Sequence, residues 1–284
     1  MAVDRRGEVI GGRFRIDDRI GAGAMAEVYR ALDETTSAYV ALKILKRQLA
    51  GEREARERFA READVQARLR HRNVAALLAT GVTDRDEPYL VVELLRGKSL
   101  RGVIKDEGRI APRRAASYAW QALHGLTAVH AAGVLHRDLK PANIMLEPSP
   151  GPIDRVVLID FGFASFEGRN SKLTLQGTVV GSLRYMAPER LRGEPPDQRS
   201  DLYAMGVILF ELLTGTPPFV AENDLDLIDL HLNVEAPALR EIDPSFPASL
   251  DAVLACALEK RVDDRYATAA DMAAALDAAA QALP

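Results

Sequence analysis

The chain has 284 residues, of which 48% are hydrophobic and 27% charged, with a formal net charge of −4 at pH 7. At roughly 150 residues per domain, this length predicts one large domain or two that pack together, with enough apolar side chains for a core. The near balance of charge argues against a general nucleic-acid or anionic-membrane binder.

Cysteine content and hydropathy point to a reducing compartment without a membrane span. The single Cys256 excludes an internal disulfide, and its place in the apolar, helix-like run 253–258 predicts a buried, reduced thiol. No apolar run approaches the roughly 18 residues that a spanning helix needs. Residues 1–7 lack the apolar core of a secretory signal, so we expect a cytoplasmic protein with no transmembrane segment in this chain.

The first third of the chain has mainly strand character. Between residues 13 and 45, short apolar runs broken by turn residues predict three strands. Residues 52–70 change to helical spacing and predict one amphipathic helix. The segments 74–82 and 89–94 return to strand character, and the polar, glycine-bearing segment 96–98 predicts a hinge.

Helices predominate after this hinge. The pattern predicts helices at about 112–131, 202–213 and 268–282. Short apolar runs at 144–146 and 156–159 are flanked by polar and proline-rich loops. We expect the chemistry in these loops, because loops on a rigid scaffold carry most catalytic residues.

A glycine-rich run at residues 21–26 (GAGAMA) follows the first predicted strand. It resembles a dinucleotide-binding fingerprint, but residues 27–31 alternate like a strand instead of opening the helix that this fold needs, and position 41 is Ala41 instead of an acidic residue. Residues 97–99 (GKS) resemble the end of a P-loop, yet Val92 stands where that motif needs glycine. What remains is a strand, glycine loop and strand, which is either an ordinary turn or a cover over phosphates.

Lys43 lies in an otherwise apolar predicted strand, residues 40–45. A lysine in such a strand commonly points to solvent. A buried lysine instead needs an anionic partner, and Glu62 in the predicted helix is a candidate.

Three motifs follow in chain order: residues 136–143 read HRDLKPAN, 160–162 read DFG and 187–189 read APE. Behind the glycine-rich hairpin and Lys43, they match the protein-kinase signature. Over about residues 11–276 the chain resembles the catalytic domain of the eukaryotic-like serine/threonine protein kinases of bacteria.

This resemblance implies an α+β, bilobal protein-kinase-like fold. The small N-lobe, about residues 11–95, would be an antiparallel sheet with one main helix, and the larger C-lobe, about 99–276, would be mainly helical. The hinge would lie at about 93–98, the ATP cleft between the lobes, and the tail at 277–284.

The resemblance also implies a role for each matching residue. Phosphoryl transfer requires positioning and charge neutralisation, so Lys43, fixed by Glu62, would hold the α and β phosphates of ATP. Asp138 would accept the proton of the substrate hydroxyl, and Lys140 would steady the phosphoryl group and marks the serine/threonine subclass. Asn143 and Asp160 would be oxygen ligands for Mg²⁺, with Mn²⁺ as an alternative.

The nucleotide site is implied in the same way. The hairpin would cover the triphosphate, adenine would lie between apolar side chains with its polar edge at the backbone of Glu93 and Leu95, and Val92 would gate the deeper pocket. The implied set is Ile20, Gly21, Ala22, Gly23, Ala24, Met25, Ala26, Glu27, Val28, Ala41, Lys43, Val92, Glu93, Leu95 and Met145.

Other polar residues are assigned to the scaffold. By resemblance, Glu189 pairs with Arg265, and Asp201 anchors the backbone of the catalytic loop. The remaining histidines lack metal-ligand spacing with cysteine, so we interpret them as packing or surface residues: His71, His124, His130 and His231.

An arginine directly before the catalytic aspartate, here Arg137 before Asp138, resembles the pattern of kinases that are switched on by phosphorylation of the loop between DFG and APE. We expect Thr174, Thr178 or both to be phosphorylated in trans by a second copy, in a transient homodimer, whereas Ser182 serves the catalytic site directly.

The expected function is therefore ATP-dependent phosphorylation of protein serine and threonine hydroxyls in bacterial signal transduction. Two alternatives stay open: a catalytically silent pseudokinase scaffold, and a small-molecule phosphotransferase of similar fold. Ala26 departs from the family pattern by replacing the third glycine, and the insertion at 147–155 has no assigned role.

Overall fold

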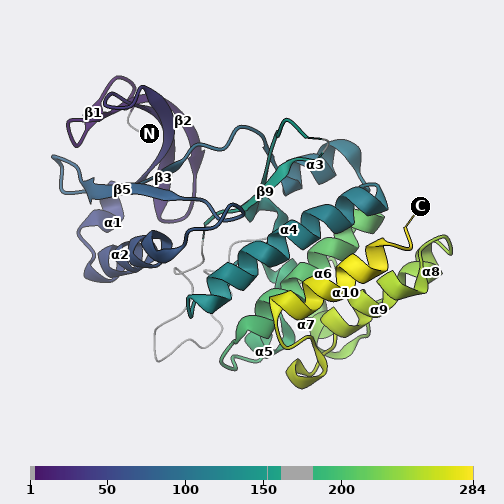
Figure 1. The fold of residues 1–284 in the computed structure, drawn as a ribbon. Coiled ribbons are helices and arrows are strands. Elements are labelled where there is room, and N and C mark those ends of the chain that lie inside the picture. Colours follow the sequence, from purple (N-terminus) through teal and green to yellow (C-terminus); the bar gives the residue numbers. More distant parts are fainter. Residues whose placement is uncertain (1–3, 152, 161–181, 284) are drawn as a thin grey trace. The chain divides into compact units, whose positions relative to one another are not determined.

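A computed structural model describes residues 4–151, 153–160 and 182–283. The chain divides into two compact units, Met1–Arg96 and Gly97–Pro284. The first unit is built on an antiparallel sheet and the second is mainly helical (Figure 1), so the predicted fold class is confirmed for each unit.

The sheet of the first unit has the strand order β1-β2-β3-β4-β6-β5, with every neighbouring pair antiparallel. Its strands are β1 (Val9–Ile10), β2 (Phe14–Ala22), β3 (Ala26–Asp33), β4 (Ala38–Leu45), β5 (Leu77–Val82) and β6 (Pro88–Glu93). The three strands expected at 13–45 are confirmed, while the short β1 was not predicted. The strand expected from residue 74 begins only at Leu77, because the Val74 amide donates to the carbonyl of His71 and closes a turn there.

The two faces of this sheet bury different clusters. One face packs Phe14, Tyr29, Leu42 and their neighbours around Tyr89. The other is covered by α2 (Arg53–Arg68), whose Phe59 and Ala63 pack with residues of the sheet, and a short α1 (Arg47–Ala50) precedes it. Successive side chains of a strand alternate between faces, so the strand that buries Leu42 on one face turns Lys43 toward α2.

The second unit carries a small sheet and a set of helices. The sheet joins β7 (Lys98–Ser99), β8 (Ile144–Glu147) and β9 (Arg155–Leu158). The helices are α3 (Leu100–Glu107), α4 (Pro112–Ala131), α5 (Pro188–Leu191), α6 (Gln198–Thr214), α7 (Asp224–Asn233), α8 (Leu239–Ile242), α9 (Ala248–Ala257) and α10 (Ala269–Ala280).

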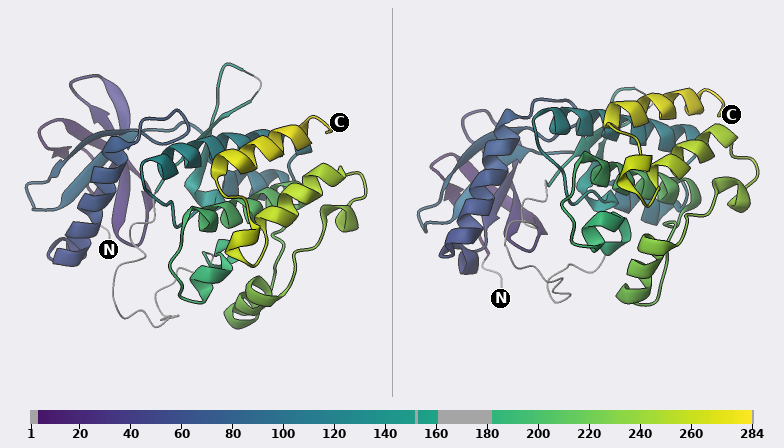
Figure 2. Two further views of the ribbon diagram at one scale, coloured as in Figure 1. Left: turned by 60° about the horizontal axis from the view of Figure 1, so that its bottom comes forward. Right: turned by 90° about the horizontal axis from the view of Figure 1, so that it is seen from below.

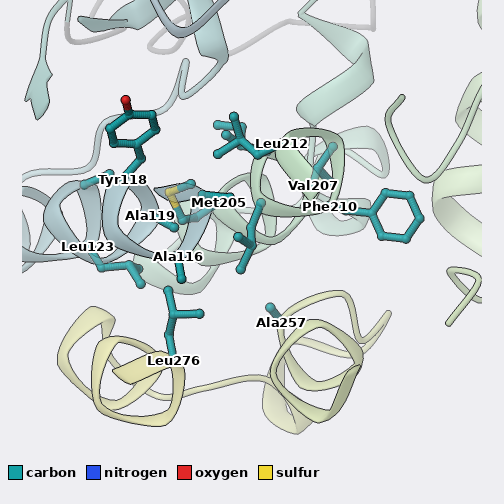
Figure 3. Close-up of a cluster of buried hydrophobic side chains, with 14 of the residues drawn as sticks. Ala116, Tyr118, Ala119, Leu123, Met205, Val207, Phe210, Leu212, Ala257 and Leu276 are labelled. Atoms are coloured by element: carbon teal, nitrogen blue, oxygen red, sulfur yellow. The ribbon is translucent and has the colours of Figure 1, made fainter. Parts of the chain in front are cut away.

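Helix α6 is the centre of this unit's core. Every residue from Ser200 to Leu213 is buried, and the core cluster joins α6 to α4, α9 and α10 (Figure 3), with α10 lying along α4 and α9 (Figure 2). The helix begins four residues before the predicted Leu202, because the Asp197 carboxylate caps it by accepting from the Arg199 amide. The first turn of α6 is polar, so apolar periodicity does not indicate where the helix begins.

Two single residues bear on packing. A Cβ at Gly97 would run into the backbone carbonyl of Leu146, so glycine is needed for the close approach of β7 to β8. Cys256 is half-buried, not fully buried as predicted, and its thiol lies 3.7 Å from the carbonyl oxygen of Asp264. Among the described residues, no helix is both long and apolar enough to cross a bilayer.

Candidate active site

Lys43 and Glu62 form an ion pair inside the first unit. The Lys43 Nζ atom lies 2.6 Å from Glu62 Oε1, and the two side chains retain only 19% and 14% of their exposure. The pair joins β4 to α2, as the sequence predicted. A salt bridge this sheltered keeps a cationic group at a fixed place on the sheet, where it is less screened than on the surface.

The glycine-rich hairpin is formed by β2, β3 and the turn between them. Gly21 pairs with Val28 in the strand register, and the Gly23 amide donates to the carbonyl of Ala26 at 2.9 Å. A Cβ at Gly21 or Gly23 would meet no atom closer than 3.8 Å, and neither residue has a positive φ. The fold itself therefore does not require glycine at either position, so the bare backbone there is available to a ligand.

The apolar residues expected to contact adenine are distributed over several elements. Within the first unit, Ala41 on β4 is opposite Val92 on β6, and Val28 on β3 is opposite Lys43. Directly opposed residues point to the same face of a sheet, and so do residues two apart on one strand, such as Ala41 and Lys43. These four residues therefore share one face. Ile20 is 49% exposed.

The end of β6 is tied to the preceding loop. The Glu93 amide and the carbonyl of Ala76 form a backbone hydrogen bond of 3.0 Å, and Glu93 Oε1 accepts from the Ala76 amide. Leu95 follows, half-buried and outside any strand. Met145 belongs to the second unit, on β8 opposite Val157.

The catalytic loop of the second unit brings three side chains together. Lys140 Nζ donates to Asp138 Oδ2 at 2.7 Å and to Ser182 Oγ at 3.1 Å, and Ser182 Oγ donates to Asp138 Oδ1 at 3.2 Å. The Asp138 side chain is 32% exposed. A partly exposed carboxylate held by a cation and a hydroxyl suits a proton acceptor, because its orientation is fixed while solvent and substrate still reach it.

The backbone ahead of Asp138 is held by Asp201, at the start of α6. Asp201 Oδ2 accepts from the His136 amide at 2.8 Å and Oδ1 from the Arg137 amide at 3.0 Å, so the predicted anchor is confirmed. His130 Nε2 lies 2.8 Å from Asp201 Oδ2. This histidine was predicted to be a packing or surface residue, and only the fold reveals its contact.

The ionisation of this buried cluster is set by its neighbours. Burial alone would raise the pKa of Asp201, but the hydrogen bond to His130 and the nearby histidines lower it below its ordinary value. Burial lowers the pKa of His136 despite the surrounding carboxylates. Asp201 is therefore an anion at neutral pH, as its two amide donors require.

Asn143 and Asp160 lie at the same end of the β8-β9 hairpin. Asn143 directly precedes β8, and its carbonyl accepts from the Ile159 amide at 3.0 Å, next to Asp160. The Asn143 Nδ2 atom donates to the Asp138 carbonyl at 2.8 Å and to Asp138 Oδ2 at 3.1 Å. With the nitrogen so engaged, the amide oxygen of Asn143 is the atom left for a cation.

Asn143 and Asp160 offer oxygen ligands of the kind that a divalent cation takes. Mg²⁺ prefers hard oxygen ligands and is commonly held by one or two carboxylates together with substrate phosphates. No group of three or more histidine, cysteine, aspartate or glutamate side chains among the described residues is arranged to hold a metal. One amide oxygen and one carboxylate would leave the other coordination positions of such an ion to ligands from outside the chain.

Helix α5 is tied into the second unit by a buried ion pair. Arg265 Nη2 lies 2.8 Å from Glu189 Oε2, with side-chain exposures of 0% and 3%. Ser200 Oγ donates to the other carboxylate oxygen of Glu189. The predicted pair of Glu189 with Arg265 is confirmed.

Several predicted residues fall outside the described part of the chain. These are Phe161, Gly162, Thr174 and Thr178. Within the described part, His231 is buried beside Tyr203, and the insertion at 147–155 is closed by an ion pair of 2.8 Å between Arg155 and Glu147.

Comparison with known proteins agrees with this geometry. The family described as protein kinase domain matches residues 14–275. A probable serine/threonine-protein kinase of Corynebacterium efficiens is 39% identical over 277 residues, covering 95% of this chain and 41% of the relative. The serine/threonine-protein kinase PknB of Mycolicibacterium smegmatis is 37% identical over 270 residues, covering 93% and 42%.

The solved structures show the same likeness. The crystal structure of the PknI kinase domain of Mycobacterium tuberculosis is 27% identical, with a TM-score of 0.75 over 99% of this chain and all of the other. The chain spans about two fifths of the length of the curated relatives it matches, 41% and 42% for the two Corynebacterium proteins.

Proposed function

The chain belongs to the protein kinase family, and we propose that it transfers the γ-phosphoryl group of ATP to serine and threonine hydroxyls of proteins. The observation that carries this proposal is the cluster of Asp138, Lys140 and Ser182, in which a partly exposed carboxylate is fixed by a cation and a hydroxyl. A silent pseudokinase would lack one of the charged groups. Here Lys43 and Asp138 are both present and held by defined partners.

In the proposed reaction one phosphorus–oxygen bond forms and another breaks. The oxygen of the substrate hydroxyl forms a bond to the γ-phosphorus, the bond from that phosphorus to the β-γ bridging oxygen breaks, and ADP leaves. Asp138 accepts the hydroxyl proton, and Lys140, 2.7 Å from it, neutralises charge on the phosphoryl oxygens.

The nucleotide would be bound by groups of the first unit. The Lys43 ammonium binds the α and β phosphates, with Glu62 fixing its position. The backbone at Gly21 and Gly23 approaches the phosphates, since no side chain intervenes there. Ile20, Val28 and Ala41 supply the apolar contacts of the adenine ring, and the backbone at Glu93 and Leu95 its hydrogen bonds.

The metal would be held by the amide oxygen of Asn143 and the carboxylate of Asp160. A bound Mg²⁺ neutralises phosphate charge and orients the phosphoryl group. Because its Nδ2 atom donates hydrogen bonds to Asp138, Asn143 also links the orientation of the proton acceptor to that of the metal ligand.

The substrate class follows from the residues near Asp138. Lys140 stands two residues after Asp138, as in the serine/threonine subclass. The names of the relatives agree, since the matches in Corynebacterium and Mycolicibacterium are serine/threonine-protein kinases. Signal transduction through protein phosphorylation is the corresponding cellular role.

The test is transfer of labelled phosphate from ATP and Mg²⁺ to a generic basic protein, followed by phosphoamino-acid analysis. We expect label on serine and threonine with the wild type and none with Asp160→Asn. Asp138→Asn should bind ATP normally but turn over about 10²- to 10⁴-fold more slowly, the scale of a positioned proton acceptor. Absence of transfer by the wild-type protein would favour the pseudokinase hypothesis, and wild-type turnover in Asp138→Asn would refute the role of Asp138.

A further inference from the structure

The backbone immediately before Asp138 forms an unusual turn. The Asp138 amide donates to the carbonyl of His136 at 2.8 Å, two residues back, and Arg137 at the centre has a φ of 64°. A hydrogen bond over this spacing with a positive central φ defines a γ-turn that is rare and strained for a residue with a side chain. Such a conformation persists only where surrounding groups hold it.

Asp201 holds one side of this turn. Its carboxylate accepts from the amides of His136 and Arg137, as described above. These contacts fix the amide groups that enter the turn. The peptide between Arg137 and Asp138 sets the direction of the Asp138 side chain. Asp201 does not hold this peptide, so other groups must fix it.

Arg190 holds the other side. Its Nη1 atom donates to the carbonyl oxygen of Arg137. That carbonyl and the Asp138 amide belong to one planar peptide, so Arg190 holds the oxygen end of the plane while His136 holds the nitrogen end.

Burying the charged guanidinium of Arg190 costs free energy, which indicates that its contact with the catalytic loop has a role. Burial and the nearby Arg137 lower its pKa, against the attraction of Asp201 and Asp138. Its Nε atom is buried without a hydrogen-bond partner among the described residues. A guanidinium that only packed against α5 would instead direct its donors to solvent.

Helix α5 explains how Arg190 reaches the loop. The neighbouring Glu189 is locked to Arg265 and Ser200 in the core of the unit. Adjacent residues on a helix point in different directions. The ion pair of Glu189 thus anchors the short helix, while Arg190 extends from it to the catalytic loop.

We propose that Arg190 is a positioning residue, which stabilises the γ-turn at Arg137 and so fixes the direction in which Asp138 presents its carboxylate. This inference rests on the proposed function and adds a residue to it. The guanidinium of Arg190 does not touch the substrate. It acts through the peptide that carries the proton acceptor.

The test compares Arg190→Met, Arg190→Lys and, as a matched control, Arg192→Met, which changes an exposed arginine of the same segment. In phosphate transfer to a basic protein, we expect kcat of Arg190→Met to fall by about tenfold or more, which is about 1.4 kcal/mol. The KM for ATP and the Tm should stay near the wild-type values. Arg190→Lys, which keeps a donor, should recover part of kcat, and Arg192→Met should match the wild type.

Hydrogen exchange supplies a readout that does not depend on activity. The amide of Asp138 should exchange faster in Arg190→Met than in the wild type and Arg192→Met, because its peptide loses one anchor. If Arg190→Met does not fold, Arg190→Gln replaces it, since the shorter amide cannot reach the carbonyl of Arg137.

The results separate this inference from the proposed function. Unchanged kcat and unchanged exchange in Arg190→Met would overturn the role of Arg190, as would a loss confined to the KM for ATP, or no recovery in Arg190→Lys. A wild-type protein without transfer activity would contradict the proposed function, and faster exchange at Asp138 would then still support the role of Arg190 in the turn.

Discussion

At the scale of single residues, Lys43 shows how a charged side chain acquires a defined task inside an apolar strand. Its neighbours Leu42 and Ile44 are buried on the opposite face of the sheet, and its own side chain meets Glu62 at 2.6 Å. The ammonium is thus held at a fixed place on the sheet by its anionic partner.

Lys43→Met tests whether this lysine serves the reaction or only the fold. We expect turnover to fall by about 10²- to 10³-fold, the scale seen when one preorganised electrostatic group is removed. We expect the free energy of unfolding to change by less than about 1 kcal/mol, because the pair retains some exposure and methionine replaces the apolar stem. Kinetics and thermal unfolding measure the two effects. If the Tm fell sharply while the activity per folded molecule stayed at the wild-type level, Lys43 would be a structural residue.

The residue-level site was predictable where a motif carried it and not where the fold alone did. The pairing of Lys43 with Glu62, that of Glu189 with Arg265 and the anchoring by Asp201 followed from the resemblance, and the structure confirms these contacts. His130 and Arg190 carry no such signal. Their contacts depend on where α4 and α5 lie, which local patterning does not specify.

At the scale of elements, the glycine-rich hairpin differs from other glycine sites in the chain. Gly21 and Gly23 have open space around a hypothetical Cβ. Gly206 on α6 instead would place a Cβ 2.9 Å from Ala257 Cβ and 3.1 Å from Leu258 Cδ2. Gly206 therefore allows close helix packing, whereas Gly21 and Gly23 leave the backbone of the hairpin uncovered.

Gly23→Ala and Gly206→Ala form a matched pair. Gly23→Ala should leave the Tm nearly unchanged and raise the KM for ATP by roughly tenfold, about 1.4 kcal/mol, since a methyl group would obstruct the phosphates. Gly206→Ala should lose about 1–3 kcal/mol of stability through overpacking, with the KM for ATP unchanged. Thermal unfolding and ATP titration separate the two outcomes. An unaltered KM in Gly23→Ala would contradict the phosphate-binding role of the hairpin.

The elements themselves were largely predictable, and the errors have local causes. The strands β2, β3, β4 and β6 and the helices α2, α4 and α10 lie close to where apolar periodicity placed them, whereas β1 was not predicted and β5 begins three residues after the predicted residue 74. The start of α6 was wrong by four residues because its first turn is polar and depends on the Asp197 cap. The γ-turn at Arg137 was not predictable, because no glycine marks its positive φ.

The buried pair of Glu189 and Arg265 predicts a pH dependence of stability. Burial alone would raise the pKa of Glu189, but Arg265 and Ser200 together lower it below its ordinary 4.5. A carboxylate with a lowered folded-state pKa adds stability above its unfolded pKa and loses it as pH falls through the folded value. The Tm should therefore decline more steeply below about pH 4.5 in the wild type than in Glu189→Gln.

Glu189→Gln should also be destabilised at neutral pH. It leaves the fully buried Arg265 side chain without its anion, a change that costs about 3–5 kcal/mol in comparable buried pairs. The Tm measured from pH 3 to 7 on both proteins gives both results. Parallel Tm profiles for the two proteins would show that another group governs acid unfolding.

At the scale of the whole molecule, two copies of the chain become relevant. The chain spans about two fifths of the length of its curated relatives, 41% and 42% for two of them. Arg137, held in its turn beside Asp138, places a permanent positive charge at the catalytic loop.

A phosphate near Arg137 would add about −1.5 to −2 charges and form charge-assisted hydrogen bonds with its guanidinium. Thr174 and Thr178, which lie outside the described residues, are the proposed acceptors. We expect one copy of the chain to phosphorylate these threonines on a second copy. Asp138 of the first copy then accepts the proton of the threonine hydroxyl, as it does for the hydroxyl of any other protein substrate.

Mixing catalytically active protein with the Asp138→Asn variant tests this control. The inactive variant should gain phosphate on Thr174, Thr178 or both, as read by mass spectrometry, only when the active protein is present. The initial rate should rise with the concentration of each partner, as for a bimolecular step. Replacing both threonines by alanine should lower the activity of the purified enzyme toward a basic protein by roughly tenfold or more, since the proposed phosphate then cannot form. Phosphate on neither threonine, or full activity of the double alanine variant, would show that the charge of Arg137 serves the fold of the catalytic loop and not a phosphorylation switch.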